Sequence, residues 1–555
     1  MRPPPHQSVL DVMQKLKAAH PLLVLTMESM IEEIISRFKP LTEEELYRIV
    51  QTLLYESYQQ SNSRYLEASG ANQETVPSAI ETNLLKISKS FLSANPVNVK
   101  FKASFDSDFV QSKPTFSQVV ERLRFWRDRL HLAIDRFPKT MTLENLSRIL
   151  VEFQKQKYDD LEVPGQYLWN KDSADNKDFV RVERFVPSVD IVRKHGTSYR
   201  RLTVRGENGG LYPFIVQHSS SRHARTEERI LQLFRLLNGV LERKKETRKR
   251  NLFFHTPAMV PVSPHVRIVQ DDPTYASLEE VYEEHCARRG QHYDEPIVLF
   301  RDKLRTFSQR PTQSKDKRIE YLTFRVDVFD EVSSKLVPAT ILSEYMAKHM
   351  ATATDLWMFK KQFTTQLAAA TFMTNSLFVG HRTPHKLNFA KSSGNVFVTE
   401  LQPVFNNAGL LDSIEAVPFR LTPNMQTFLT ADGIEGPFSN SLMVIARSLL
   451  EPEFHMKDFL ALFIRDELIS WLSIQRTMSN APVLQTAADL RDKVNDNVEL
   501  VLSRVRNFGC VGTPLNPAAE KLVPSPVNFQ IQKLIAAATD PQQLSQMDPT
   551  WHPWL

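Results

Sequence analysis

The stretch from Ser376 to Phe405, SLFVGHRTPHKLNFAKSSGNVFVTELQPVF, contains three side chains whose types bear on phosphoryl transfer: His381, Lys386 and Glu400. Phosphoryl transfer needs oxygen ligands that hold magnesium against the phosphates, a carboxylate that orients the attacking hydroxyl, and a cation on the phosphates. An imidazole at 381 could accept a proton, whereas an ammonium at 386 cannot ligate a cation and would repel one. Glu400 alone supplies a carboxylate. Because such groups act as a unit, we expect almost no metal-dependent turnover.

The same run resembles the catalytic loop and metal-binding strand of the phosphatidylinositol-3-kinase-related protein kinases, which read roughly L-G-D-R-H-P-S-N and then I-D-F-G. Four residues stand at matching places: Gly380, Arg382, Pro384 and Gly394. The resemblance implies that His381 replaces the catalytic Asp, Lys386 the magnesium-binding Asn, and Glu400 the Asp of D-F-G. We therefore predict no catalytic, cofactor-binding or metal-binding residues. The degenerate kinase positions are Gln217, His381, Lys386 and Glu400.

The phosphate side of this resemblance is degenerate too. Family members carry Lys-Gly at the end of the third strand, whereas the strand LYPFIV here runs into Gln217, with no lysine between 215 and 221. The glutamate that would pair with that lysine in the family, Glu227 or Glu228, remains. The segment KHGTSY, which begins at Lys194, matches the family's phosphate-facing loop. Because Lys194 could approach a phosphate from another side, residual nucleotide binding stays open, although no cofactor is expected.

Three interpretations of Lys386 and Glu400 are open. The alignment with the kinase loop could be false, so that both are ordinary loop residues, or the two could line a functional pocket. We hypothesise that they form an ion pair in the place where active relatives bind metal. A side-chain ammonium there would neutralise a carboxylate that otherwise lacks a counter-charge. Such a pair would hold the fold without nucleotide.

The helices and strands that must position these residues are predicted in the order in which they occur in a kinase fold. Residues 8–60 and 113–157 place apolar residues at spacings of three and four, which predicts amphipathic helices. Thr42 and Glu45 have the spacing of a capping box. Residues 180–217 predict β-strands, with a tight turn over the sequence ENGG. Helices are predicted over three further segments: 225–244, 277–290 and 417–506.

Strands with one helix, followed by a helix-rich half, predict an α+β, two-lobed protein-kinase-like fold of the PI3/PI4-kinase type. The expected domains are the end of a helical FAT-type bundle at 1–160, an N-lobe at 161–270, a C-lobe at 271–510 and a FATC segment at 523–555. Trp551 and Trp554 are expected to pack against the C-lobe, because each would bury a large apolar area. The first helices imply more chain before them, so we expect a fragment of a larger protein.

Composition limits the class and the compartment. The chain has 555 residues, a formal net charge of +5 and 42% hydrophobic residues, which suits a folded protein of about two to four domains. Cys286 and Cys510 are its two cysteines and argue for a reducing compartment. No run of about 18 uncharged apolar residues predicts a membrane span, so no membrane partner is expected. Histidines and cysteines show no metal-ligand spacing.

The basic segment from Arg243 to Arg250 could be a nuclear-localisation or phosphate-binding patch. A solvated helix end is favoured, because no aromatic residue is interleaved to stack on bases, and no direct nucleic-acid binding is expected. The resemblance implies the family's catalytically inactive member, a nuclear scaffold whose partners are subunits of SAGA-type histone acetyltransferase complexes and transcriptional activators. Two alternatives stay open: an active serine/threonine protein kinase of the family with rearranged catalytic residues, and a basic nucleic-acid-binding module.

Overall fold

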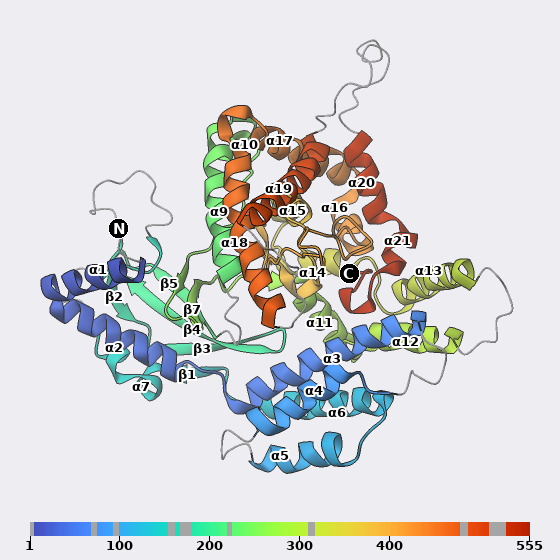
Figure 1. Cartoon of the computed structure of the whole chain (residues 1–555), viewed down its shortest axis with the longest axis horizontal. Coiled ribbons are helices and arrows are strands. Elements are labelled where there is room, and N and C mark those ends of the chain that lie inside the picture. The colour runs from blue at the N-terminus through green and yellow to red at the C-terminus, as the bar shows by residue number, and fades with distance from the viewer. Residues whose placement is uncertain are drawn as a thin grey trace, which may run out of the picture. The chain divides into compact units, whose positions relative to one another are not determined.

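The computed structural model of the chain describes residues 5–67, 75–92, 99–153, 161–166, 179–218, 225–308, 317–477, 487–509 and 529–555. The chain divides into two compact units, and Figure 1 labels their helices and strands. The first comprises residues 1–54, 76–224 and 257–273, and the second comprises residues 55–75, 225–256 and 274–555.

An antiparallel sheet forms the centre of the first unit. Its strands are β1 (Thr140–Thr142), β2 (Val182–Phe185), β3 (Ser188–Lys194), β4 (Thr197–Gly206), β5 (Leu211–His218), β6 (Met259–Pro261) and β7 (Val266–Gln270). The strand order is β1-β3-β4-β5-β7-β6, and β2 pairs with β4. The ENGG turn joins β4 to β5 as predicted, with Gly209 at a φ of 76°. The β-strands predicted between 180 and 217 are therefore confirmed.

One face of this sheet carries the core of the unit. Along β4 every second residue is buried, the alternation of a strand with one covered face. Leu202 and Val204 of β4 share a cluster with Ile34 and Phe38, which come from helix α2 (Pro21–Arg37) and the residue after it. The short helices α7 (Leu143–Leu146) and α8 (Arg148–Val151) add Leu143 and Leu150 to the same cluster. The remaining helices of this part are α1 (Pro5–Ala19), α4 (Ser78–Lys86), α5 (Val99–Phe105), α6 (Phe116–Ile134) and residues 42–54 of α3 (Thr42–Glu67).

The compact units divide the chain differently from the expected domains. Strand β1 lies within the 113–157 segment for which helices were predicted, and it pairs with β3. Helix α2, from the segment assigned to the FAT-type bundle, packs into the core of the sheet. The first unit thus crosses the expected boundary at 160, because an apolar helix face and a strand from the N-terminal segment complete the core of the sheet.

The capping box predicted from Thr42 and Glu45 is wrong. Glu44 accepts a hydrogen bond from the backbone N–H of Leu41 at 2.8 Å, while Glu45 binds Arg48. The acidic residue one position earlier therefore satisfies a free N–H group at the start of α3.

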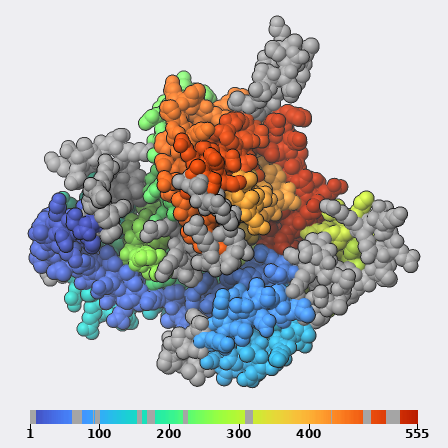
Figure 2. Space-filling model, in the orientation of Figure 1, coloured from blue at the N-terminus to red at the C-terminus, as the bar shows by residue number. Residues whose placement is uncertain are grey.

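The second unit is mainly helical. Its helices are α9 (Arg225–Arg243), α10 (Lys245–Lys249), α11 (Leu278–Arg289), α12 (Glu295–Ser308), α13 (Lys317–Lys335), α14 (Ile341–His349), α15 (Ala353–Ser376), α16 (Pro423–Gly433), α17 (Ser439–Leu449), α18 (Met456–Thr477), α19 (Ala487–Gly509), α20 (Phe529–Thr539) and α21 (Pro541–Gln546). Strands β8 (Tyr275–Ser277), β9 (Leu387–Ala390) and β10 (Val396–Val398) form a small antiparallel sheet in the order β10-β9-β8. The outer surface of α18 is visible in orange in Figure 2.

Several predicted elements of this unit are confirmed. Helix α11 begins with a capping box at Ser277 and ends at Gly290, which adopts a left-handed conformation. Helix α9 covers the segment predicted between 225 and 244. Trp551 and Trp554 are both buried, as expected for the tail.

Candidate functional site

Helix α15 positions the candidate loop. From Phe363 to Thr374 nearly every side chain of α15 is buried, so the helix is fixed on all sides before the chain turns out at Leu377. Gly380 follows, and a Cβ there would lie 2.7 Å from a side-chain carbon of Val404. A larger residue would displace its neighbour, so glycine is needed at this position for a packing reason.

Lys386 and Glu400 meet as hypothesised. Lys386 lies in the single turn that precedes β9, and its Nζ is 3.6 Å from Oε2 of Glu400, just beyond β10. The side chain of Lys386 is 13% exposed and that of Glu400 is 64% exposed. An ion pair this open to water contributes at most about 1 kcal/mol. The contact is confirmed, but solvent weakens its energetic value.

Glu227 is the second acidic residue near this position. Its Oε1 accepts a hydrogen bond of 3.3 Å from the backbone N–H of Glu400. Glu400 itself has a φ of 52°, in the left-handed region that few residues other than glycine adopt. Glu227, one of the two glutamates that the resemblance offers as a partner for a phosphate-binding lysine, is therefore in contact with the loop backbone.

His381 also has a left-handed backbone, with a φ of 52°. Desolvation, followed by the positive charge of Lys386, lowers the pKa of its imidazole below the ordinary value. The ring is therefore neutral at pH 7 and could accept a proton. The carboxylates of Glu415 and Asp548 act in the opposite direction to Lys386 and raise this pKa, but they have smaller effects.

Gln217 lies in the first unit, on β5. Its Oε1 accepts a hydrogen bond of 2.9 Å from Nε of Arg267, the residue opposite it on β7. The side chain of Gln217 thus forms a hydrogen bond between two neighbouring strands. Ser219 to Ser221, the remainder of the segment searched for a lysine, lie outside the described residues.

Magnesium does not fit the residues that surround Lys386. The ion requires several oxygen ligands in a nearly ideal octahedron, and Lys386 places an ammonium beside the carboxylate of Glu400. Within the described ranges, no three His, Cys, Asp or Glu side chains are grouped as metal ligands. No reaction step through a metal follows from this geometry.

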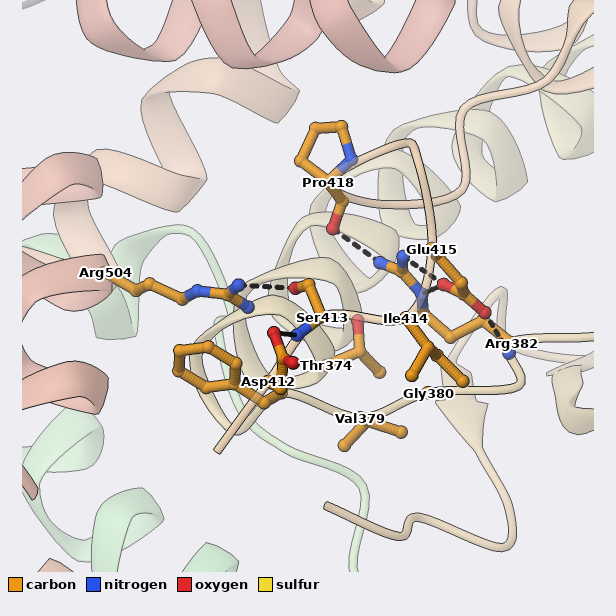
Figure 3. A pocket seen from close by; sticks show the side chains of 11 residues that line it. Thr374, Val379, Gly380, Arg382, Asp412, Ser413, Ile414, Glu415, Pro418 and Arg504 are labelled. Atoms are coloured by element: carbon orange, nitrogen blue, oxygen red, sulfur yellow. Dashed lines mark hydrogen bonds and ion pairs between the residues drawn. The ribbon is translucent and has the colours of Figure 1, made fainter. Parts of the chain in front are cut away.

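Arg382, one residue beyond His381, is held very differently. Its backbone N–H donates to Oε1 of Glu415 at 2.9 Å, and its guanidinium binds the other carboxylate oxygen of Glu415 and the carbonyl of Val417. Figure 3 shows Arg382 and Glu415 meeting at one side of a small pocket, while Arg504 points to Ser413 at another. Both guanidinium groups of this pocket are therefore engaged by the protein itself.

Arg420 joins the loop to the tail. Its guanidinium donates to the carbonyls of Arg382, Trp551, His552 and Leu555, and its Cζ lies 3.7 Å from the ring centroid of Trp551. Nε1 of Trp551 donates to Glu415 at 3.0 Å. Burial lowers the pKa of Arg420 to about 9, so the group remains charged at pH 7. We name Arg382, Glu415, Arg420 and Trp551 the tail cluster.

Sequence comparison identifies the family to which this architecture belongs. Residues 212–473 match the family model "Phosphatidylinositol 3- and 4-kinase", and residues 524–555 match "FATC domain". The chain is 34% identical to the SAGA complex/NuA4 acetyltransferase complex subunit TRA1 of Saccharomyces cerevisiae over 99% of this chain and 14% of that protein. It is 33% identical to the human transformation/transcription domain-associated protein over 98% of this chain and 14% of that protein. The chain belongs to the phosphatidylinositol-3-kinase-related family.

Solved structures agree on the fold. The FAT and kinase domain of CtTel1 superposes with a TM-score of 0.50 at 16% identity and covers 91% of this chain and 34% of that chain. The predicted family and the two-lobed α+β fold are confirmed. No helix in the described part of the chain is long and apolar enough to cross a bilayer. The chain spans 14% of the length of the curated relatives named above.

The basic segment from Arg243 to Arg250 lies apart from this site in the chain. Lys244 forms an ion pair with Glu451, and Arg250 pairs with Glu246 at 2.6 Å. Arg248 and Lys249 are exposed on α10. The segment is thus a solvated short helix with one internal ion pair and a second ion pair to Glu451, in agreement with the solvated helix end that sequence analysis favours.

Sequence reasoning identified Arg382 as a position that matches the family. It missed the other three members of the tail cluster as contacts of this loop. The signal was present in VPFRLT at 417–422, which contains Arg420, and in the tail tryptophans. The sequence does not show that Glu415 and Trp551 contact each other, because they are 136 residues apart in the chain.

Proposed function

We propose that this chain is the kinase-like region of a nuclear acetyltransferase-complex subunit that works by binding and transfers no phosphate. The observation that carries the proposal is the Lys386 ammonium 3.6 Å from Glu400. It places a cation where the kinase resemblance implies a metal site. Together with His381 and Gln217, it leaves the resemblance without its catalytic Asp, metal-binding Asn and phosphate-binding Lys.

The names of the relatives support the complex to which such a region would belong. Two yeast relatives, at 34% and 35% identity, are named as subunits of the SAGA and NuA4 acetyltransferase complexes. We infer that subunits of such complexes, and transcriptional activators, are the partners of the protein to which this chain belongs. The corresponding role is that of a scaffold in the nucleus.

A ligand titration tests the loss of nucleotide binding. A ligand that binds only the native state raises its melting temperature. Mg-ATP at millimolar concentration is expected to leave the melting temperature of the chain unchanged, while an active kinase of the family, used as a positive control, shifts upward. A saturable increase in the melting temperature of this chain would contradict the proposal.

Radiolabelled phosphate transfer tests the chemistry itself. The homogeneous chain is expected to transfer no more phosphate than a blank. Glu400→Gln is the matched control, because it removes the one carboxylate of the loop and little volume. Magnesium-dependent transfer that is present in the chain and lost in Glu400→Gln would establish the active-kinase alternative. Transfer that persists in Glu400→Gln would be assigned to a contaminating kinase.

Complex membership has a separate test. A tagged full-length protein is expected to co-purify with histone acetyltransferase activity from nuclear extract. The same purification with the tail cluster disrupted by Arg420→Ala reports whether the kinase-like region must be folded for assembly. Absence of acetyltransferase activity from the intact protein would sink this part of the proposal.

A further inference from the structure

The turn between β3 and β4 is the segment that matches the family's phosphate-facing loop. It is a two-residue hairpin turn in which His195 and Gly196 have φ values of 51° and 72°, and Lys194 pairs with Thr197 at its base. Two successive left-handed residues are typical of the tight turns that join twisted antiparallel strands. The turn is therefore well defined by its own backbone.

Helix α3 contacts the tip of this turn. A Cβ built on Gly196 would lie 2.1 Å from Oε1 and 2.8 Å from Cδ of Gln51. Gln51 is only 8% exposed, so its amide group has little room to move aside. Glycine at 196 thus serves two purposes, since it permits the left-handed backbone and the close approach of α3.

The same helix also contacts the two strands that lead to the turn. Oε2 of Glu44 is 2.7 Å from Nη2 of Arg200 on β4, and Oε1 is 3.7 Å from Nε of Arg193 on β3. The side chain of Glu44 is fully buried and that of Arg200 is 2% exposed. Removing one partner of a buried ion pair leaves an uncompensated charge and is strongly destabilising.

Glu44 and Gln51 lie about two turns apart on α3, and hence on the same face. One face of one helix therefore holds both the tip of the hairpin and its stem. We infer that α3 clamps the β3–β4 turn in a single position. The inference rests on the proposed function for the identity of the turn, and it adds a second reason, independent of the catalytic loop, for the loss of nucleotide binding.

The clamp bears on Lys194, which could have approached a phosphate from another side. Some nucleotides could bind only if the turn moves. Such a nucleotide must bind the moved turn more tightly than the clamped turn, by more free energy than breaking the contacts of α3 costs. The ligand class that the clamp excludes is a nucleoside triphosphate whose phosphates require closure of the turn.

Hydrogen exchange of the full 555-residue chain tests the clamp. The amides of residues 194–200 are expected to exchange slowly in the wild type. Glu44→Gln, which leaves Arg200 buried without a counter-charge, is expected to speed their exchange by about 100-fold or more. The strand amides at the β5–β7 pairing serve as the internal reference and should change little. Equal exchange at the turn before and after the substitution would overturn the inference.

Two glycines provide a matched pair in case Glu44→Gln fails to fold. Gly196 and Gly209 both have left-handed φ values, at 72° and 76°, and both lie in hairpin turns of β4. A Cβ on Gly209 meets nothing within 4 Å, whereas one on Gly196 meets Gln51. Gly196→Ala is therefore expected to lower the folding equilibrium constant by about tenfold more than Gly209→Ala.

Adding Gln51→Ala to Gly196→Ala should restore most of that difference, because it removes the obstructing amide. Equal effects of the two glycine substitutions, or no rescue by Gln51→Ala, would show that α3 does not hold the turn. The outcomes are separable from those of the proposed function. An Mg-ATP shift in the wild type contradicts the proposed function, whereas unchanged exchange in Glu44→Gln contradicts the clamp alone.

Discussion

Two neighbouring residues of one loop, His381 and Arg382, have opposite surroundings. Arg382 is 8% exposed and donates hydrogen bonds to Glu415 and to backbone carbonyls. His381 is exposed, and among the charges that act on its imidazole the ammonium of Lys386 has the largest effect on the pKa, which it lowers. Where the loop meets the protein interior, its polar groups are fully engaged. At the positions that the kinase resemblance assigns to chemistry, the loop has an exposed imidazole and an ammonium beside a solvated carboxylate.

The difference shows which part of a kinase-like loop the fold itself requires. A buried charge must be paired and hydrogen-bonded, otherwise desolvation makes it costly. The tail cluster meets this requirement from protein groups alone. The shape of the loop can therefore persist without nucleotide or metal, and the positions that only chemistry requires are free to change.

Arg420→Ala is expected to have the largest effect, because it removes the centre of the tail cluster. The substitution removes the guanidinium donor from the backbone oxygens of Arg382, Trp551, His552 and Leu555. The free energy of unfolding should fall by at least about 3 kcal/mol, since each buried acceptor loses a charged donor. Urea denaturation of the chain, followed by tryptophan fluorescence, measures this change.

Arg420→Lys separates charge from geometry in that experiment. An ammonium keeps the positive charge but cannot reproduce the planar fork of the guanidinium. Lysine is therefore expected to recover only a minor part of the loss. Full recovery would mean that charge alone holds the tail, and a loss below about 1 kcal/mol in Arg420→Ala would break the comparison between the two sides of the loop.

His552 makes the tail side sensitive to acid. Its ring lies among Tyr282, Tyr293 and Trp554, and burial lowers its pKa from 6.5 to about 4. The unfolded chain therefore binds a proton at higher pH than the folded chain. Stability is expected to fall as pH drops from about 6.5 to about 4, by about 3 kcal/mol in total for a shift of this size.

His552→Phe is the control for this pH dependence, because it keeps an aromatic ring and removes the titrating nitrogens. The unfolding midpoint in urea, measured between pH 4 and pH 7, should fall less steeply in His552→Phe than in the wild type. His218, His285 and His381 also have lowered pKa values, so part of the slope will remain. Identical slopes in the two proteins would show that His552 is not responsible.

The contact between Lys386 and Glu400 could be predicted from sequence because the two residues lie close together in the chain. His381, Lys386 and Glu400 lie within one loop and the strand after it, so the contact of Lys386 with Glu400 is local. Helices and strands such as α11 and β4 were likewise predictable from apolar spacing and from capping and turn residues.

The tail cluster and the contacts of α3 could not be predicted in that way. Glu44 and Arg200 are 156 residues apart, and nothing in the local pattern of either residue specifies the other. Strand β1 lies in a segment for which the sequence predicts helix, because three residues are too few to show a period of two. The contact of Glu44 with Arg200 and the pairing of β1 with β3 both depend on tertiary structure, which a single sequence does not show.

Lys386→Met is expected to have the smallest effect and tests the other half of the comparison. Methionine keeps an unbranched apolar chain in place of the lysine methylenes and removes the charge that lies 3.6 Å from Glu400. Because Glu400 is 64% exposed, water can replace the ammonium, and the free energy of unfolding should change by less than about 1 kcal/mol. Arg382→Met is the matched variant, since it removes a cation from the same loop but leaves Glu415 buried, and it should cost several times more. Equal losses in the two variants would mean that the Lys386–Glu400 pair is as structural as the tail cluster, and solvent exposure would no longer distinguish the two sides of the loop.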